Sequence, residues 1–245
     1  MSEYDSDFYK HHQEMSASSA GEIVPLVLEL VRPKRVVDVG CGLGTWLSVF
    51  RKNGIEDILG IDGEWVDPKM LLIPEDKFRR ANLKEPLKLD RTFDLVVSLE
   101  VAEHLPEEHA ETFVSSLTGL GPVILFSAAI PFQGGQNHVN EQWPEYWQKL
   151  FKRQNFVIVD CLRKLIWNNE KVEYWYAQNI FIYVKKSYLK SNKKLHEEWK
   201  TTDTSRLSVV HPQMYLRTAN NYIELKNSIP RPVIKIGKKM KRIMK

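Results

Sequence analysis

The chain has 245 residues, of which 43% are hydrophobic and 27% charged, a composition typical of a globular domain with some additions. No apolar run is long enough to cross a membrane, and the polar N-terminus lacks the apolar segment of a secretory signal. The two cysteines, Cys41 and Cys161, lie far apart without metal-ligand spacing, which indicates buried thiols in a reducing compartment. We therefore expect a cytoplasmic protein.

The charge is unevenly distributed. The formal net charge is +4, but residues 231–245 hold seven basic residues and no acidic one, so without them the net charge is −3. A mildly acidic body argues against binding nucleic acid over the whole surface. The basic tail fits peripheral contact with an anionic membrane, a solvated terminus, or contact with a phosphate-rich acceptor, and the sequence leaves these three open.

Hydrophobic periodicity predicts alternating helices and strands from residue 20 onward. In chain order we expect a helix at 21–31, strand 35–39, helix 46–52, strands 57–61, 78–81 and 93–99, helix 107–120, strand 123–128, helix 143–153, and strands 156–162 and 176–184. Strands that are apolar throughout and separated by helices indicate a mostly parallel sheet covered on both faces. The last two strands, with only an aromatic-rich turn between them, suggest an antiparallel hairpin. The fold class is thus a three-layer Rossmann-like α/β sheet with a C-terminal extension.

Composition divides the chain into three segments. Residues 1–19 read as an N-terminal lid, 20–185 as the core domain, and 186–245, lysine-rich at its start and poor in periodic apolar positions, as an extension that ends in the basic tail.

The strongest local motif is VVDVGCGLGTW at residues 36–46. Gly40, Gly42 and Gly44 form a tight loop between a strand and a helix, where the backbone must approach a ligand closely. Asp38 precedes this loop, where it would repel a pyrophosphate, and Asp62 ends the next strand, where it would meet ribose hydroxyls. Two acids at these points fit a ligand with an ammonium group at one end and a ribose at the other, which is S-adenosylmethionine.

Residues 34–105 resemble the class I methyltransferases that use S-adenosylmethionine, with VVDVGCGLGTW, LGIDG and FDLVVSLEVAEHL similar to three of that family's motifs. The resemblance implies that Asp38 and the glycines lie along the methionine moiety, that Asp62 binds the ribose, and that Asn82 and Leu83 flank the adenine. The family more often has Asp where this chain has Asn82. The full set of expected cofactor-binding residues is Asp38, Gly40, Cys41, Gly42, Asp62, Gly63, Asn82, Leu83, Leu99 and Glu100.

A second cluster follows the strand at 93–99. Glu100, Glu103 and His104 form an E-x-x-E-H motif, and His138 follows the neighbouring strand, so we expect all four at the same edge of the sheet as possible ligands of Mg²⁺ or Mn²⁺. With Glu141 and the aromatic pair that follows it, this resembles metal-dependent O-methyltransferases, including the small-RNA terminal 2′-O-methyltransferases. An E-H-L motif also occurs in class I methyltransferases without metal, in which case His104 or His138 would be the catalytic base.

The sequence therefore predicts methyl transfer to an oxygen of a small molecule or surface glycan, with a divalent metal orienting the acceptor hydroxyl as one form of the mechanism. Three alternatives stay open: RNA 2′-O-methylation, N-methylation of an amine or amino sugar, and a non-catalytic cofactor-binding protein associated with a membrane.

Overall fold

The computed structural model describes residues 3–228, with side chains from residue 13 onward. The basic tail therefore lies outside the described residues, and its membrane contact stays a prediction. The chain divides into two compact units, and the division falls between Val209 and Val210. The second unit contains helix α9 (Pro212–Ser228), where the sequence had shown few periodic apolar positions.

The first unit is built on one seven-stranded sheet with the order β3-β2-β1-β4-β5-β7-β6. All neighbouring strands are parallel except β7, which is antiparallel to both β5 and β6. The strands are β1 (Arg35–Val39), β2 (Asp57–Asp62), β3 (Phe78–Arg80), β4 (Leu95–Leu99), β5 (Val123–Ser127), β6 (Phe156–Val159) and β7 (Phe181–Lys185). The expected Rossmann-like methyltransferase sheet, mostly parallel with an antiparallel pair at its end, is confirmed.

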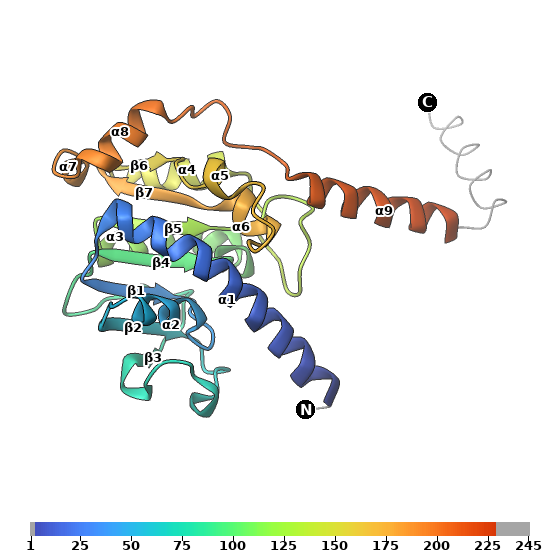
Figure 1. Ribbon diagram of the computed structural model, residues 1–245, viewed down its shortest axis with the longest axis horizontal. Helices are drawn as coiled ribbons and strands as arrows, with labels where there is room; N and C mark the ends of the chain where they lie inside the picture. Colours follow the sequence, from blue (N-terminus) through green and yellow to red (C-terminus); the bar gives the residue numbers. More distant parts are fainter. Residues whose placement is uncertain (1–2, 229–245) are drawn as a thin grey trace. The chain divides into compact units, whose positions relative to one another are not determined.

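Helices cover both faces of this sheet. Figure 1 shows the strands stacked from β3 to β6 with α1 crossing the face of the sheet. One core lies between the sheet and α1, α2 and α8, and the other between the sheet and α3 and α4. The longer helices of this unit are α1 (Glu3–Val31), α2 (Thr45–Lys52), α3 (Ala110–Leu120), α4 (Pro144–Arg153) and α8 (Lys193–Thr201). Every residue of β4 and β5 is buried, because the central strands are covered on both sides.

Two expectations about local structure were wrong. The expected strand at 176–184 begins only at Phe181, because Tyr174–Asn179 forms helix α6. Two short helices, α5 (Arg163–Ile166) and α6, therefore separate β6 from β7 in place of a simple aromatic turn. The three aromatic residues at 174–176 suit a strand by propensity, but all three lie in helix α6. Tyr176 packs from this helix on Trp46, with the two ring centroids 5.1 Å apart.

The expected boundary at residues 19 and 20 falls inside α1, which runs without a break from Glu3 to Val31. Ser18 Oγ donates to the carbonyl of Lys171 at 2.9 Å, and Ser19 Oγ accepts from the Glu173 amide at 3.0 Å, so this part of α1 is attached to the core domain. The aromatic and histidine side chains before residue 13 are not described, and their role as a lid stays a prediction. Within the described part of the chain, no helix has both the length and the apolarity of a membrane span.

Candidate functional site

The glycine loop turns sharply where β1 ends. Gly40, Gly42 and Gly44 have positive φ angles of 85°, 53° and 82°, which only glycine adopts at little cost. A Cβ atom on Gly40 would come within 2.4 Å of the Val101 side chain. The Gly40 amide donates to the carbonyl of Ile61 at 2.7 Å, which holds the loop against the end of β2. The loop conformation is therefore determined by backbone geometry and by close contact with the residues after β4.

Two buried carboxylates flank this loop. Asp62 accepts backbone hydrogen bonds from Gly42 and Gly63, each at 2.6 Å. Burial raises the pKa of Asp62, although these two hydrogen bonds lower it. Burial raises the pKa of Asp38 well above its usual range, and the charge of Asp62 raises it further. A cationic group beside Asp38 would reduce this electrostatic cost, which is what the ammonium of a methionine moiety would do.

The other expected cofactor residues lie around the same edge of the sheet. Leu99 ends β4 and is buried, as is Leu83, which follows β3. The Cys41 thiol is buried, which raises its pKa. Asn82 is exposed and donates to Glu85 at 3.1 Å. The parallel order of β1, β2, β3 and β4 brings these residues to one edge, and their direct contact with a cofactor stays a prediction.

Glu100 follows β4 in a left-handed conformation with φ of 53°. Its carboxylate accepts hydrogen bonds from Gln133 Nε2 at 2.7 Å and Asn179 Nδ2 at 3.3 Å, and Asn179 also donates to Gln133 Oε1 at 2.8 Å. Burial raises the pKa of Glu100, while these hydrogen bonds lower it. The sequence analysis missed Gln133 and Asn179. The only signal was a polar pair, Gln178 and Asn179, inside an apolar run.

Glu103, His104 and His138 lie together, with one potential ligand atom from each within 4.8 Å of the others. The two imidazole rings are perpendicular, with centroids 4.8 Å apart. Glu103 is 0% exposed, and neither of its carboxylate oxygens makes a hydrogen bond of good geometry with the described residues. Burial, and next the charge of Glu100, raise its pKa well above the usual range, while looser contacts with the backbone of Glu103 and Ala129 lower it. The structure thus brings three of the four expected metal ligands together and holds Glu100 beside them in its own hydrogen-bond network.

The loop that carries His138 is attached to Glu103 through the backbone. The Asn140 amide donates to the Glu103 carbonyl at 3.0 Å. Glu141 accepts from the Gly134 amide at 2.7 Å and lies 3.0 Å from Nδ1 of His138. With the proton on Nδ1, the Nε2 lone pair of His138 is free to bind a metal or accept a proton.

The donor set fits a divalent transition metal. Two imidazoles and a buried carboxylate suit Mn²⁺ better than Mg²⁺, which prefers oxygen ligands. A cation would also compensate the buried Glu103 carboxylate, which has no cationic partner and no hydrogen bond of good geometry among the described residues. Desolvation lowers the pKa of His104, and His138 lowers it further, so His104 is a neutral ligand or base at pH 7.

Comparisons with known proteins identify the family of the domain. Residues 9–167 match a family model described as a methyltransferase domain. No curated protein sequence is significantly similar to the chain. Among solved structures, the methyltransferase domain of bacterial CtHen1 is 21% identical with a TM-score of 0.51, covering 69% of this chain and 99% of that one.

Two further structures share the fold. Magnesium protoporphyrin IX methyltransferase (ChlM) from Synechocystis PCC 6803, with bound S-adenosylhomocysteine, is 17% identical with a TM-score of 0.52, covering 76% of this chain and 89% of that one. DesVI from Streptomyces venezuelae is 16% identical with a TM-score of 0.55, and the match covers 74% of this chain and 96% of that one. The family match spans well over half of the chain, and the glycine loop, the acids and the sheet order agree with it. The chain therefore belongs to the class I S-adenosylmethionine-dependent methyltransferases.

Proposed function

We propose that this enzyme transfers the methyl group of S-adenosylmethionine to a hydroxyl oxygen of a small-molecule or glycan acceptor, with a divalent cation held by Glu103, His104 and His138. The observation that carries the proposal is the buried Glu103 carboxylate, which makes no hydrogen bond of good geometry with the described residues, beside two imidazoles. When bound, such a cation lowers the pKa of a hydroxyl and orients it.

The chain's own residues would perform the remaining tasks. The glycine loop and Asp38 would position the methionine end of the cofactor, since rate depends on alignment of sulfur, methyl carbon and acceptor oxygen. With the cation bound, both histidines would serve as ligands and the acidified hydroxyl would release its proton to water. Without a cation, His104 or His138 would accept that proton. Glu100, fixed by Gln133 and Asn179, would keep a negative charge next to the site without moving toward the acceptor.

Calorimetric titration of Mn²⁺ tests the proposal directly. We expect wild type to bind Mn²⁺, and Glu103→Gln and His138→Ala to lose at least about tenfold in affinity, as expected for losing a ligand. His196→Ala is the matched control, because His196 stacks on Trp199 in α8, away from this cluster in the sequence and outside its ligand set. S-adenosylmethionine affinity should be unchanged in all three variants. Equal Mn²⁺ affinity in wild type and His138→Ala would refute the metal site.

If no cation binds, the site would instead use a histidine as base, and amines become acceptors as plausible as hydroxyls. CalS10, an amino pentose methyltransferase, has the same fold with a TM-score of 0.51 at 13% identity. Methyl transfer to an amino sugar in the absence of any metal would then support the N-methyltransferase alternative.

A further inference from the structure

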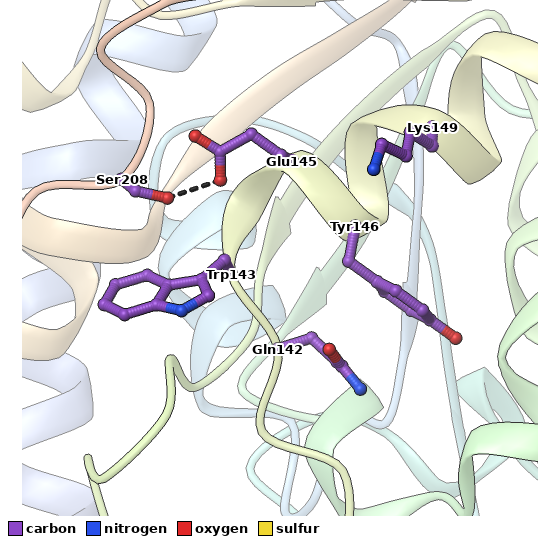
Figure 2. A pocket seen from close by; sticks show the side chains of 6 residues that line it. All are labelled: Gln142, Trp143, Glu145, Tyr146, Lys149 and Ser208. Carbon is purple, nitrogen blue, oxygen red and sulfur yellow. Dashed lines mark hydrogen bonds between the residues drawn. The ribbon is translucent and has the colours of Figure 1, made fainter.

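An open pocket with a volume of about 540 Å³ lies at the start of α4, beside the segment that carries His138. It is lined by Gln142, Trp143, Glu145, Tyr146, Lys149 and Ser208. Figure 2 shows the rings of Trp143 and Tyr146 on either side of the Gln142 side chain, with Glu145 bonded to Ser208. Trp143 is 40% exposed, so part of its ring surface can meet a ligand. The size is in the range of ligand pockets.

A second cavity adjoins the first along α4, and Tyr146 and Lys149 line both. Its other lining residues include Glu107, Glu108 and Glu111. We call the two cavities together the α4 groove. Four carboxylates and only two cations line it, and one of these cations, Arg153, is paired with Glu111 at 3.7 Å. The groove is therefore net negative, which disfavours a polyanion such as RNA.

The two segments that carry His104 and His138 continue along the chain into residues that line the α4 groove. Glu107 follows His104 by three positions, and Gln142 follows His138 by four. Gln142 Nε2 donates to Asn140 Oδ1 at 3.0 Å, and the amide of the same Asn140 binds the Glu103 carbonyl. A molecule bound in the groove would thus lie beside the segments that hold Glu103 and His138.

A buried arginine holds the segment that forms one wall of the groove. The Arg163 guanidinium donates to the carbonyl of Leu207 at 2.8 Å and is paired with Asp160. Since Arg163 is 5% exposed, these bonds are shielded from water. They position Ser208, the next residue along the chain, against Glu145 at the rim of the pocket. The segment around Ser208 that forms this wall is thus fixed by buried hydrogen bonds and an ion pair.

The chemistry of the groove combines aromatic surfaces with an amide, carboxylates and one lysine. Aromatic rings contact the apolar faces of sugar rings, and polar side chains beside them bind hydroxyl groups. Burial, and next Glu107, raise the pKa of Tyr146, so its hydroxyl stays a neutral hydrogen-bonding group. We propose that the α4 groove is the acceptor-binding subsite and that its ligand is a neutral, polyhydroxylated sugar. This inference rests on the proposed function, because it names the substrate class of the same site.

Binding to a printed array of neutral oligosaccharides, with a short single-stranded RNA as a further probe, tests the inference. We expect wild type to retain neutral glycans, and Trp143→Ala to lose about tenfold or more of this binding, the effect of removing an aromatic anchor. Trp143→Phe should restore most of it. Trp199→Ala is the matched control, because Trp199 is 39% exposed, close to the 40% of Trp143, but lies in α8.

Three results would overturn the inference: no neutral glycan retained by wild type, equal retention by Trp143→Ala, or preferential retention of the RNA. Calorimetry on the same samples separates this inference from the proposed function. Trp143→Ala should bind S-adenosylmethionine and Mn²⁺ as wild type does, because Trp143 is not among the residues of either predicted site. If Mn²⁺ fails to bind while Trp143-dependent glycan binding persists, the metal-assisted mechanism is wrong, but the assignment of the α4 groove as a sugar-binding subsite stands.

Discussion

The two halves of the site are constructed differently. The cofactor edge, after β1 and β2, depends on backbone: three glycines with positive φ and two acids, all within residues 38–63. The proposed acceptor edge, after β4 and β5, depends on side chains that meet across the chain, such as Glu100 with Asn179, which are 79 positions apart. A short motif marks the first half, whereas the second depends as well on contacts that form only when the chain folds. Four substitutions test this contrast, in order of their expected effect on stability.

Gly40→Ala should have the largest effect. The new Cβ would lie 2.4 Å from Val101 at a φ of 85°, so overpacking and backbone strain together should cost about 2–4 kcal/mol of unfolding free energy. We expect affinity for S-adenosylmethionine to fall roughly a hundredfold, because the loop must shift. Gly42→Ala is the control: its φ is 53° but no atom lies within 4 Å, so it should cost only about 1 kcal/mol. Denaturant unfolding measures the stability of the two variants, and calorimetry measures their affinity for S-adenosylmethionine. Equal effects of the two substitutions would contradict the role given to Val101.

Asn179→Ala should have the next largest effect, about 1–3 kcal/mol, because it removes the amide that donates to Gln133 Oε1 and to Glu100 Oε1. The matched change at the cofactor edge is Asn82→Ala. Asn82 is exposed and its bonds are local, reaching only Lys84 and Glu85, so its loss should cost about 0.5 kcal/mol or less. Urea unfolding compares the two. If Asn82→Ala were the more destabilising, the contrast between local and long-range construction would fail.

Asp38→Asn should stabilise the cofactor-free protein by about 1 kcal/mol at pH 7 and weaken cofactor binding about tenfold. The pKa of Asp38 is raised in the folded state, so the folded protein binds more protons than the unfolded chain. The contribution of Asp38 to stability is therefore complete below its unfolded pKa and is lost as pH rises through the folded pKa. The stability difference between Asp38→Asn and wild type should grow with pH in melting experiments without cofactor. A difference independent of pH would show that Asp38 is not protonated in the free protein.

Gly135→Ala should change stability least and still alter function. A Cβ there would lie 2.2 Å from Nε2 of His138, so the imidazole must rotate and would lose its 3.0 Å contact with Glu141. We expect Mn²⁺ affinity to fall about tenfold with about 0.5 kcal/mol of destabilisation. Gly134→Ala should do the reverse: its φ is 68° and no atom lies within 4 Å, so strain costs about 1 kcal/mol while His138 stays in place. Unchanged Mn²⁺ binding by Gly135→Ala would place the metal elsewhere.

The sequence predicted the sheet and most of its strands because buried parallel strands are apolar runs that local patterning reveals. It failed at 176–179, where residues expected in a strand form part of helix α6, and Tyr176 there contacts Trp46 of α2 and Ser16 of α1. It also missed the Gln133 and Asn179 side chains, because a polar pair inside an apolar run does not say which distant residue it meets.

By itself, then, the sequence specified the predicted cofactor half: the glycine loop and its flanking acids lie within residues 38–63, and the backbone conformation of the loop follows from its glycines. For the proposed acceptor half, the sequence indicated that Glu103, His104 and His138 share one edge of the sheet, and the tertiary structure decided which side chains meet there. The β4–β5 pairing places Glu103 and His104 against His138, and the Arg163 clamp brings Ser208 to the α4 groove. These groups lie far apart along the chain, and only packing of the whole sheet determines which of them meet.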